Sequence, residues 1–174
     1  LNVKLMRKND PEKIKNSYLE IAQKLENAGA GAIIICANTP HLVYDFVQPK
    51  IDIPILHIAD AIAKEAKQKD FKKLGLLGTK PTMTGDFLQG RLKKNHQIET
   101  IIPSQEHIDE THRFISEELT QGNFTETAKN FYLEQMQLLQ DRGADAIILG
   151  CTELPMLIKE IQELRSRVAV LEAN

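Results

Sequence analysis

The chain has two cysteines, Cys36 and Cys151, and each follows a similar stretch of sequence. Residues 29–40 read GAGAIIICANTP, and residues 143–155 read GADAIILGCTELP. Each stretch has a Gly-Ala pair, a short aliphatic run, and then a cysteine with small polar neighbours. A run of this length is too short for a helix and predicts a buried strand that ends in a thiol. Because ligands of open α/β sheets bind at the carboxyl ends of strands, both thiols are candidates for chemistry.

Several uses of the two thiols are possible. They could be buried as small hydrophobic residues. A disulfide is disfavoured, because 174 residues can form a core without cross-links and nothing marks the chain as secreted. A metal site needs more ligands than two thiols, and no further His or Cys lies beside either one at ligand spacing. The repetition favours two acid–base or nucleophilic groups that face each other, as a reaction on both faces of one carbon requires.

Polar side chains near the predicted strand ends could bind a carboxylate. Asn38 and Thr39 precede a predicted helix at 41–47, where free backbone N–H groups and the helix dipole favour an anion. Thr39 could instead only cap that helix. A second group of hydroxyls occupies a predicted loop at 79–84, between a strand and a helix. The single histidine of the apolar segment 54–58, His57, is more typical of a packed residue than of a catalytic one.

Strands and helices alternate in the predicted secondary structure, which is typical of an α/β fold. Asp10 and Pro11 indicate a helix start, and Gly29 ends that helix. The predicted strands are 33–35, 73–79, 98–102, 146–149 and a possible strand start at 168–171. The predicted helices are 10–28, 41–47, 60–69, one containing residues 87–92, 104–118, 125–140 and 157–164.

The composition excludes several classes of protein. Hydrophobic residues make up 42% of the chain, charged residues 26%, and the formal net charge is −2. Acidic and basic residues are interspersed, without the basic stripe that binds nucleic acid. No apolar run approaches the ~20 residues that span a membrane, and no signal sequence is visible. We therefore expect a cytoplasmic protein that binds neither nucleic acid nor membranes, and we expect a homodimer. Because the chain begins at Leu1 rather than Met, we expect it to be incomplete.

Five motifs together resemble the aspartate/glutamate racemase family, the cofactor-independent amino-acid racemases. They are CANT at 36–39, LHIAD at 56–60, LLGT at 76–79, TMTGDF at 82–87 and GCTE at 150–153. The resemblance implies two similar α/β lobes, each with a mainly parallel sheet flanked by helices, and an active site in the cleft between them. It also divides the chain: residues 1–52 and 165–174 form a first lobe, incomplete at its N-terminus, and residues 53–164 form the second.

The resemblance further implies racemisation of aspartate or glutamate by proton transfer at Cα, with no pyridoxal phosphate and no metal. One cysteine from each lobe, Cys36 and Cys151, would be the catalytic acid and base. The expected substrate-binding residues are Asn38, Thr39, Thr79, Thr82, Thr152 and Glu153. The carboxylate of Glu153 could orient the substrate ammonium group or a neighbouring donor, or it could simply be solvated at a helix start.

One position departs from the family pattern. Members that act on aspartate often carry a basic residue immediately before the glycine that is Gly122 here, and this chain has Gln121. A glutamine cannot form the charge-assisted bond that lysine makes to a side-chain carboxylate. The substrate could therefore be glutamate or another amino acid, or the specificity could be mixed. Related functions also stay open: a reaction of the maleate isomerase, hydantoin racemase or decarboxylase type, or carboxylate binding without catalysis. A redox dithiol is weaker, because its cysteines would be close in sequence.

Overall fold

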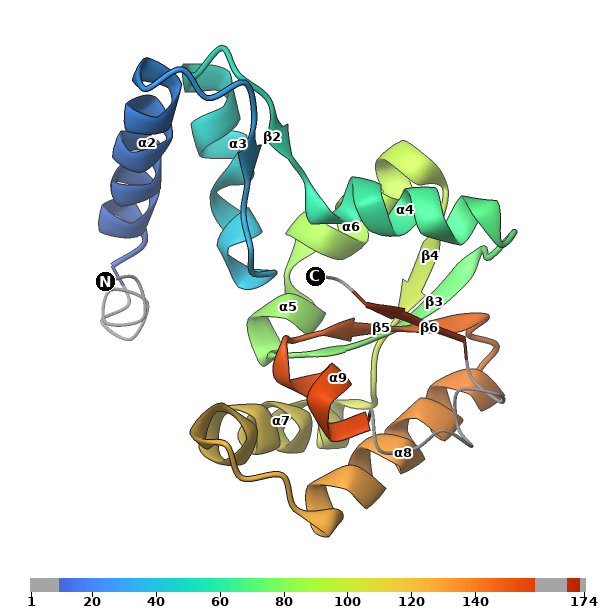
Figure 1. The fold of residues 1–174 in the computed structure, drawn as a ribbon. Helices are drawn as coiled ribbons and strands as arrows, with labels where there is room; N and C mark the ends of the chain where they lie inside the picture. Colours follow the sequence, from blue (N-terminus) through green and yellow to red (C-terminus); the bar gives the residue numbers. More distant parts are fainter. Residues whose placement is uncertain (1–9, 159–168, 173–174) are drawn as a thin grey trace. The chain divides into compact units, whose positions relative to one another are not determined.

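The computed structural model in Figure 1 describes residues 10–158 and 169–172. These residues form two compact units. The small unit comprises residues 10–36 and 40–57, and the large unit comprises residues 37–39, 58–158 and 169–172. Each unit has a parallel sheet with helices packed on it, so the predicted α/β class is confirmed.

The small unit begins with helix α2 (Pro11–Asn27). The Asp10 side chain caps this helix by accepting a hydrogen bond from the Lys13 backbone N–H at 3.1 Å. Pro11 occupies the first turn, where its missing N–H is not needed. The predicted helix start is therefore confirmed.

A two-stranded parallel sheet completes the small unit. Strand β1 (Ile33–Ile34) pairs with β2 (Ile55–Leu56), and Ile33 and Ile55 pack into a core with residues of α2 and α3. The elements between the strands are η1 (Thr39–Val43), α3 (Tyr44–Val47) and η2 (Gln48–Lys50). The helix predicted at 41–47 is thus a 3₁₀ turn followed by a short α-helix.

The large unit contains a four-stranded parallel sheet in the order β4-β3-β5-β6. Its strands are β3 (Lys73–Gly78), β4 (Glu99–Ile101), β5 (Ala146–Gly150) and β6 (Ala169–Glu172). Its helices are α4 (Ile58–Gln68), α5 (Lys80–Thr84), α6 (Asp86–His96), α7 (Gln105–Arg113), the π-helix η3 (Phe114–Glu118), the 3₁₀ turn η4 (Leu119–Gln121), α8 (Glu126–Asp141) and α9 (Glu153–Ile158).

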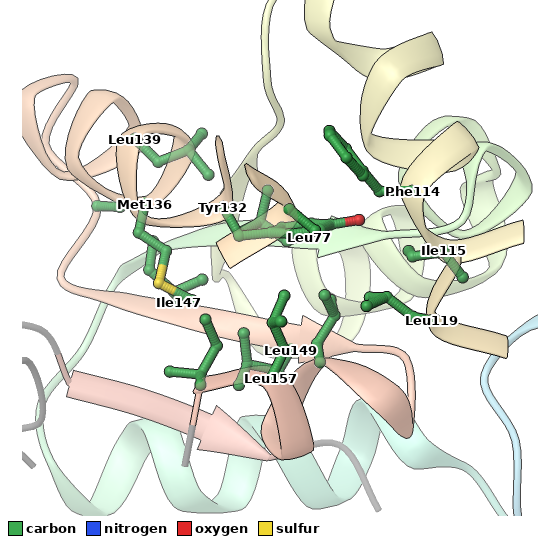
Figure 2. Packing of buried hydrophobic residues seen from close by; sticks show 14 residues of the cluster. Leu77, Phe114, Ile115, Leu119, Tyr132, Met136, Leu139, Ile147, Leu149 and Leu157 are labelled. Atoms are coloured by element: carbon green, nitrogen blue, oxygen red, sulfur yellow. The ribbon is translucent and has the colours of Figure 1, made fainter. Parts of the chain in front are cut away.

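Side chains alternate between the two faces of this sheet, and each face supports its own core. Leu74 and Leu76 of β3 pack with residues of α4 and α6. On the other face, Leu77 packs with Ile147 and Leu149 of β5 and with residues of η3, α8 and α9 (Figure 2). Burial on both faces explains why the strand sequences are continuous apolar runs without polar alternation.

The two Gly-Ala pairs of the sequence repeat form the same helix cap. Gly29 and Gly143 have φ angles of 87° and 89°, in the left-handed region that favours glycine. The amide of the following alanine bonds back to the helix, Ala30 to the Leu25 carbonyl and Ala144 to the Leu139 carbonyl, each at 3.1 Å. This is the Schellman arrangement, which ends a helix and directs the chain into the next strand.

Three segments differ from the predicted elements. Residues 80–84 form helix α5 rather than a loop, because Thr79 is extended and Pro81 fits the first turn. The helix predicted at 104–118 becomes a π-helix after Arg113. The helix predicted at 157–164 already begins at Glu153, and its positions 159–164 lie outside the described residues.

The described residues divide differently from the predicted lobes. The prediction groups residues 165–174 with the first lobe, whereas the backbone of β6 pairs with β5 in the large unit. The boundary near residue 53 falls instead after His57, because β2 pairs with β1 before α4 begins. Among the described residues, no helix is long and apolar enough to cross a membrane.

An ion-pair cluster joins helices α4 and α6. Arg91 donates two hydrogen bonds to the Asp60 carboxylate, at 2.7 and 2.8 Å, and His96 Nε2 lies 2.8 Å from the same carboxylate. The hydrogen bonds from Arg91 are the main cause of the lowered pKa of Asp60, which falls to about 2. His96 also lowers this pKa, and burial opposes both effects. The cluster therefore stabilises the ionised form of Asp60.

We expect Asp60→Asn to lower the free energy of unfolding by about 1 kcal/mol near neutral pH, a figure reduced for solvent screening because Asp60 is partly exposed. A lowered pKa contributes stability above the ordinary value of the carboxyl, and that stability disappears as the pH falls toward about 2. Urea titrations at neutral and acid pH should therefore show a smaller pH effect in the variant than in the parent. Equal effects would contradict this role.

Candidate functional site

Two of the predicted site residues follow neighbouring strands of the large sheet. In the parallel pair of β3 and β5, Gly78 is in register with Gly150. Thr79 and Cys151 come immediately after these glycines, so both emerge at the carboxyl edge of the sheet. This is the edge at which open α/β sheets bind their ligands.

Three threonine hydroxyls meet at this edge. The Oγ1 atoms of Thr39, Thr79 and Thr82 lie 3.0 to 3.3 Å from one another. Thr82 is fully buried, whereas Thr39 and Thr79 are partly exposed. Each hydroxyl can donate or accept a hydrogen bond, so rotation about the C–O bonds can direct the hydroxyl hydrogens of the cluster toward a bound anion. The structure therefore brings together three of the hydroxyls that were expected to hold a carboxylate.

Glycines leave room for Thr82 over the sheet. A Cβ added to Gly78 would lie 3.2 Å from the Thr82 methyl group, and one added to Gly150 would lie 3.3 Å from it. The Gly150 Cβ would also approach the Leu77 carbonyl oxygen to 2.9 Å. The pair of glycines thus lets the first turn of α5 sit close to the strand ends.

We expect Gly150→Ala to lower the free energy of unfolding by about 1–3 kcal/mol, because the new methyl group meets backbone that cannot easily move. Gly31→Ala is a suitable control, because a Cβ there would meet nothing within 4 Å, and its effect should stay within about 0.5 kcal/mol. Urea unfolding measures both variants. Equal stability of the two would show that the close approach at Gly150 costs nothing.

The Cys151 thiol interacts with the start of helix α9. Its Sγ donates a hydrogen bond to Oε2 of Glu153 at 2.8 Å, and the exposed Thr152 hydroxyl donates to the same oxygen at 2.8 Å. Burial, and next the Glu153 carboxylate, raise the pKa of Cys151 to about 12. Burial opposes ionisation of Glu153 as well, but the hydrogen bonds from Cys151 and Thr152 lower its pKa overall. At neutral pH this pair is therefore a thiol beside a carboxylate.

Tyr132 belongs to the surroundings of Cys151, and the sequence analysis did not identify it. This tyrosine is fully buried in the cluster against which Cys151 packs (Figure 2), and its hydroxyl donates to the Thr111 carbonyl at 2.6 Å. Burial, and then the nearby Cys151, raise the pKa of Tyr132, so the phenol stays neutral. A tyrosine at helical spacing among apolar residues looks like any core residue, so only the tertiary structure identifies it.

The remaining predicted site residues, Cys36 and Asn38, belong to different units. Cys36 is exposed and follows β1, as predicted. Asn38 is buried and is grouped with the large unit, as Thr39 is. His57 is buried, with its ring edge-on to His41 at 4.6 Å and to Tyr44 at 4.8 Å. This is the packed histidine that the sequence favoured.

No group of three or more His, Cys, Asp or Glu side chains within the described ranges is arranged to hold a metal ion.

Comparisons with known proteins agree on one family. The family model for Asp/Glu/Hydantoin racemase matches residues 6–173. The broad specificity amino-acid racemase RacX of Bacillus subtilis (strain 168) is 28% identical over 165 residues, which cover 95% of this chain and 69% of that protein. The glutamate racemase of Aquifex pyrophilus is 26% identical, over 90% of this chain and 59% of its own length.

A solved structure extends the likeness to the fold. The crystal structure of an aspartate racemase homologue from Pyrococcus horikoshii OT3 superposes with a TM-score of 0.82 at 36% identity. The match covers 99% of this chain and 75% of that one. The fold and the family model therefore agree, while the relatives themselves are longer than this chain.

Proposed function

Because the chain belongs to the Asp/Glu/hydantoin racemase family, we propose that it racemises an acidic amino acid, aspartate or glutamate. Cys36 and Cys151 are the two acid–base groups of this proposal. The observation that carries it is the placement of the Cys151 thiol and the Thr39–Thr79–Thr82 hydroxyl cluster at the carboxyl ends of two neighbouring strands. A thiol and a carboxylate cradle are two of the components that such a reaction needs at one Cα.

The proposed reaction moves one proton off Cα and another onto its opposite face. One sulfur, as thiolate, takes the α-proton, and the other, as thiol, delivers its own proton to the carbanion. After turnover the two sulfurs have exchanged protonation states, so the opposite enantiomer is the substrate of that form. The hydrogen bond from Cys151 to a carboxylate suits it to the thiol state at the start of a turnover.

The carbanion has no cofactor to stabilise it in this proposal, so the substrate carboxylate must carry the charge as it acquires enediolate character. Thr39, Thr79 and Thr82 supply hydroxyl donors within one cluster. Thr152 directly follows Cys151, and Asn38 comes two residues after Cys36. Donors that are already oriented toward the developing charge cost no reorganisation during the reaction. The cluster is therefore the proposed anion cradle.

The choice between aspartate and glutamate depends on groups that contact the side-chain carboxylate. Gln121 ends the 3₁₀ turn η4, which contacts helix α9, and its amide donates to the Thr120 hydroxyl at 3.3 Å. A neutral amide binds a carboxylate less strongly than a lysine does. We therefore propose a mixed specificity for both acidic amino acids rather than a strict one for aspartate.

A screen of single enantiomers in heavy water tests the proposed function. Proton NMR would follow loss of the α-proton signal for each of the common L-amino acids, and chiral chromatography would follow inversion. Aspartate, glutamate or both should exchange and invert. Binding of either one without exchange would instead indicate a carboxylate-binding protein, and exchange confined to another amino acid would contradict the proposed substrate class.

A further inference from the structure

The Glu153 carboxylate contacts the two residues that precede it. Its Oε2 accepts hydrogen bonds from both Cys151 Sγ and Thr152 Oγ1, each at 2.8 Å. The sequence left three roles open for this residue: to orient the substrate ammonium group, to orient a neighbouring donor, or to be solvated. Its carboxylate in fact accepts from a neighbouring hydroxyl and also from the Cys151 thiol. Glu153 and Cys151 are both partly buried, and Thr152 is exposed.

We infer that Glu153 is a positioning residue that holds Cys151 in the thiol form and connects its proton to solvent. This inference rests on the proposed function. The geometry supports it in two ways: the carboxylate lies within hydrogen-bond distance of the sulfur, and it shares that oxygen with an exposed hydroxyl. A second negative charge on sulfur at this distance would be repelled by the carboxylate.

Other titratable groups around the same buried cluster do not replace Glu153. Tyr132 of α8 is neutral, and its hydroxyl is used by the Thr111 carbonyl. Glu118, at the end of η3, is paired with Arg113 at 3.0 Å and accepts a hydrogen bond from Thr125. The turn η4, which contacts α9, carries only Leu119, Thr120 and Gln121. Glu153 is thus the carboxylate that acts directly on the sulfur.

The proton balance gives this contact a role in each cycle. When the thiol gives its proton to the substrate carbanion, an S–H bond breaks and a C–H bond forms, and sulfur keeps the electron pair as thiolate. The thiolate beside it then raises the proton affinity of Glu153, which takes a proton from water and passes it to the Cys151 sulfur, while the Cys36 thiol releases to water the proton that it took from Cα. The thiol and the carboxylate are restored without a second substrate molecule.

Alkylation of Cys151 tests the inference without any substrate. In a Cys36→Ser background, mass spectrometry would follow the rate of reaction with iodoacetamide between about pH 6 and pH 10, because only the thiolate reacts. We expect Glu153→Gln to react roughly tenfold faster than the background protein near pH 8, since one pKa unit is a factor of ten in thiolate. Glu153→Asp, which keeps the charge but reaches less far, should fall between the two.

Glu126→Gln is the matched control, because Glu126 also begins a helix but is exposed and pairs with Lys129 at 3.2 Å. Its alkylation profile should equal that of the background protein. Identical profiles for Glu153→Gln, Glu153→Asp and the background would overturn the inference. That outcome would not affect the proposed racemisation. Conversely, a shifted Glu153→Gln profile in a protein whose parent shows no racemisation would contradict the proposed function but not the contact between Glu153 and the thiol.

Discussion

Cys36→Ser and Cys151→Ser are each expected to lose racemisation in both directions, with turnover lowered by at least about 10²–10⁴-fold. Inversion needs a base on one face of Cα and an acid on the other, and each cysteine supplies one of them in the proposed reaction. Serine keeps nearly the same shape, but its hydroxyl is far less acidic than a thiol. The rate of inversion, measured by chiral chromatography, should therefore fall equally whether the L- or the D-enantiomer is the starting substrate.

Stability measurements separate this loss from unfolding. Both serine variants should retain the parent's urea midpoint, because Cys36 is exposed and Cys151 is only half-buried. A variant with one cysteine that still inverts its substrate at the parent rate would show that one base is enough. The two-base account would then be wrong.

Thr79→Val should lower turnover by about 10²–10³-fold, the size of effect that follows loss of one oxyanion-hole donor. Valine has nearly the same shape as threonine but removes the hydroxyl that meets Thr39 at 3.3 Å and Thr82 at 3.0 Å. The two remaining hydroxyls would then have to stabilise the enediolate alone. Steady-state kinetics should show the loss mainly in kcat, because the missing bond strengthens as charge develops.

Thr84→Val provides the control for this prediction. Thr84 is in the same short helix, but its exposed hydroxyl donates to the Lys80 carbonyl and has no place in the cluster. Its turnover should stay within about a factor of two of the parent. A Thr79→Val variant with unchanged turnover would remove Thr79 from the proposed cradle.

Local features of the fold could be predicted from the sequence. The Gly-Ala pairs predict helix ends, because the left-handed φ of Gly29 and Gly143 depends only on the neighbouring backbone. The apolar runs after them predict buried strands, and β5 is buried throughout, whereas β1 spans only Ile33–Ile34 and its Ile34 is exposed. The partner of β6 could not be predicted, since a short apolar segment does not specify which sheet edge it joins.

The site shows the same division between local and long-range information. Residue types and the family resemblance indicated Thr39, Thr79 and Thr82, which the structure brings into one cluster across 40 positions of sequence. The contact between Cys151 and Glu153 depends on the rotamers at the start of α9, and spacing alone left several roles open. The place of Tyr132 in the apolar cluster that contacts Cys151 depends on how α8 packs on the sheet.

Hydrogen–deuterium exchange at Cα in the two single-cysteine variants tests the two-base claim most directly. A remaining thiolate can remove the α-proton only from the enantiomer whose hydrogen faces it, and it returns deuterium to that same face. NMR in heavy water should therefore show exchange without inversion, confined to one enantiomer in Cys36→Ser and to the opposite enantiomer in Cys151→Ser. Exchange of the same enantiomer in both variants, or of both enantiomers in either one, would contradict the assignment of one thiol to each face.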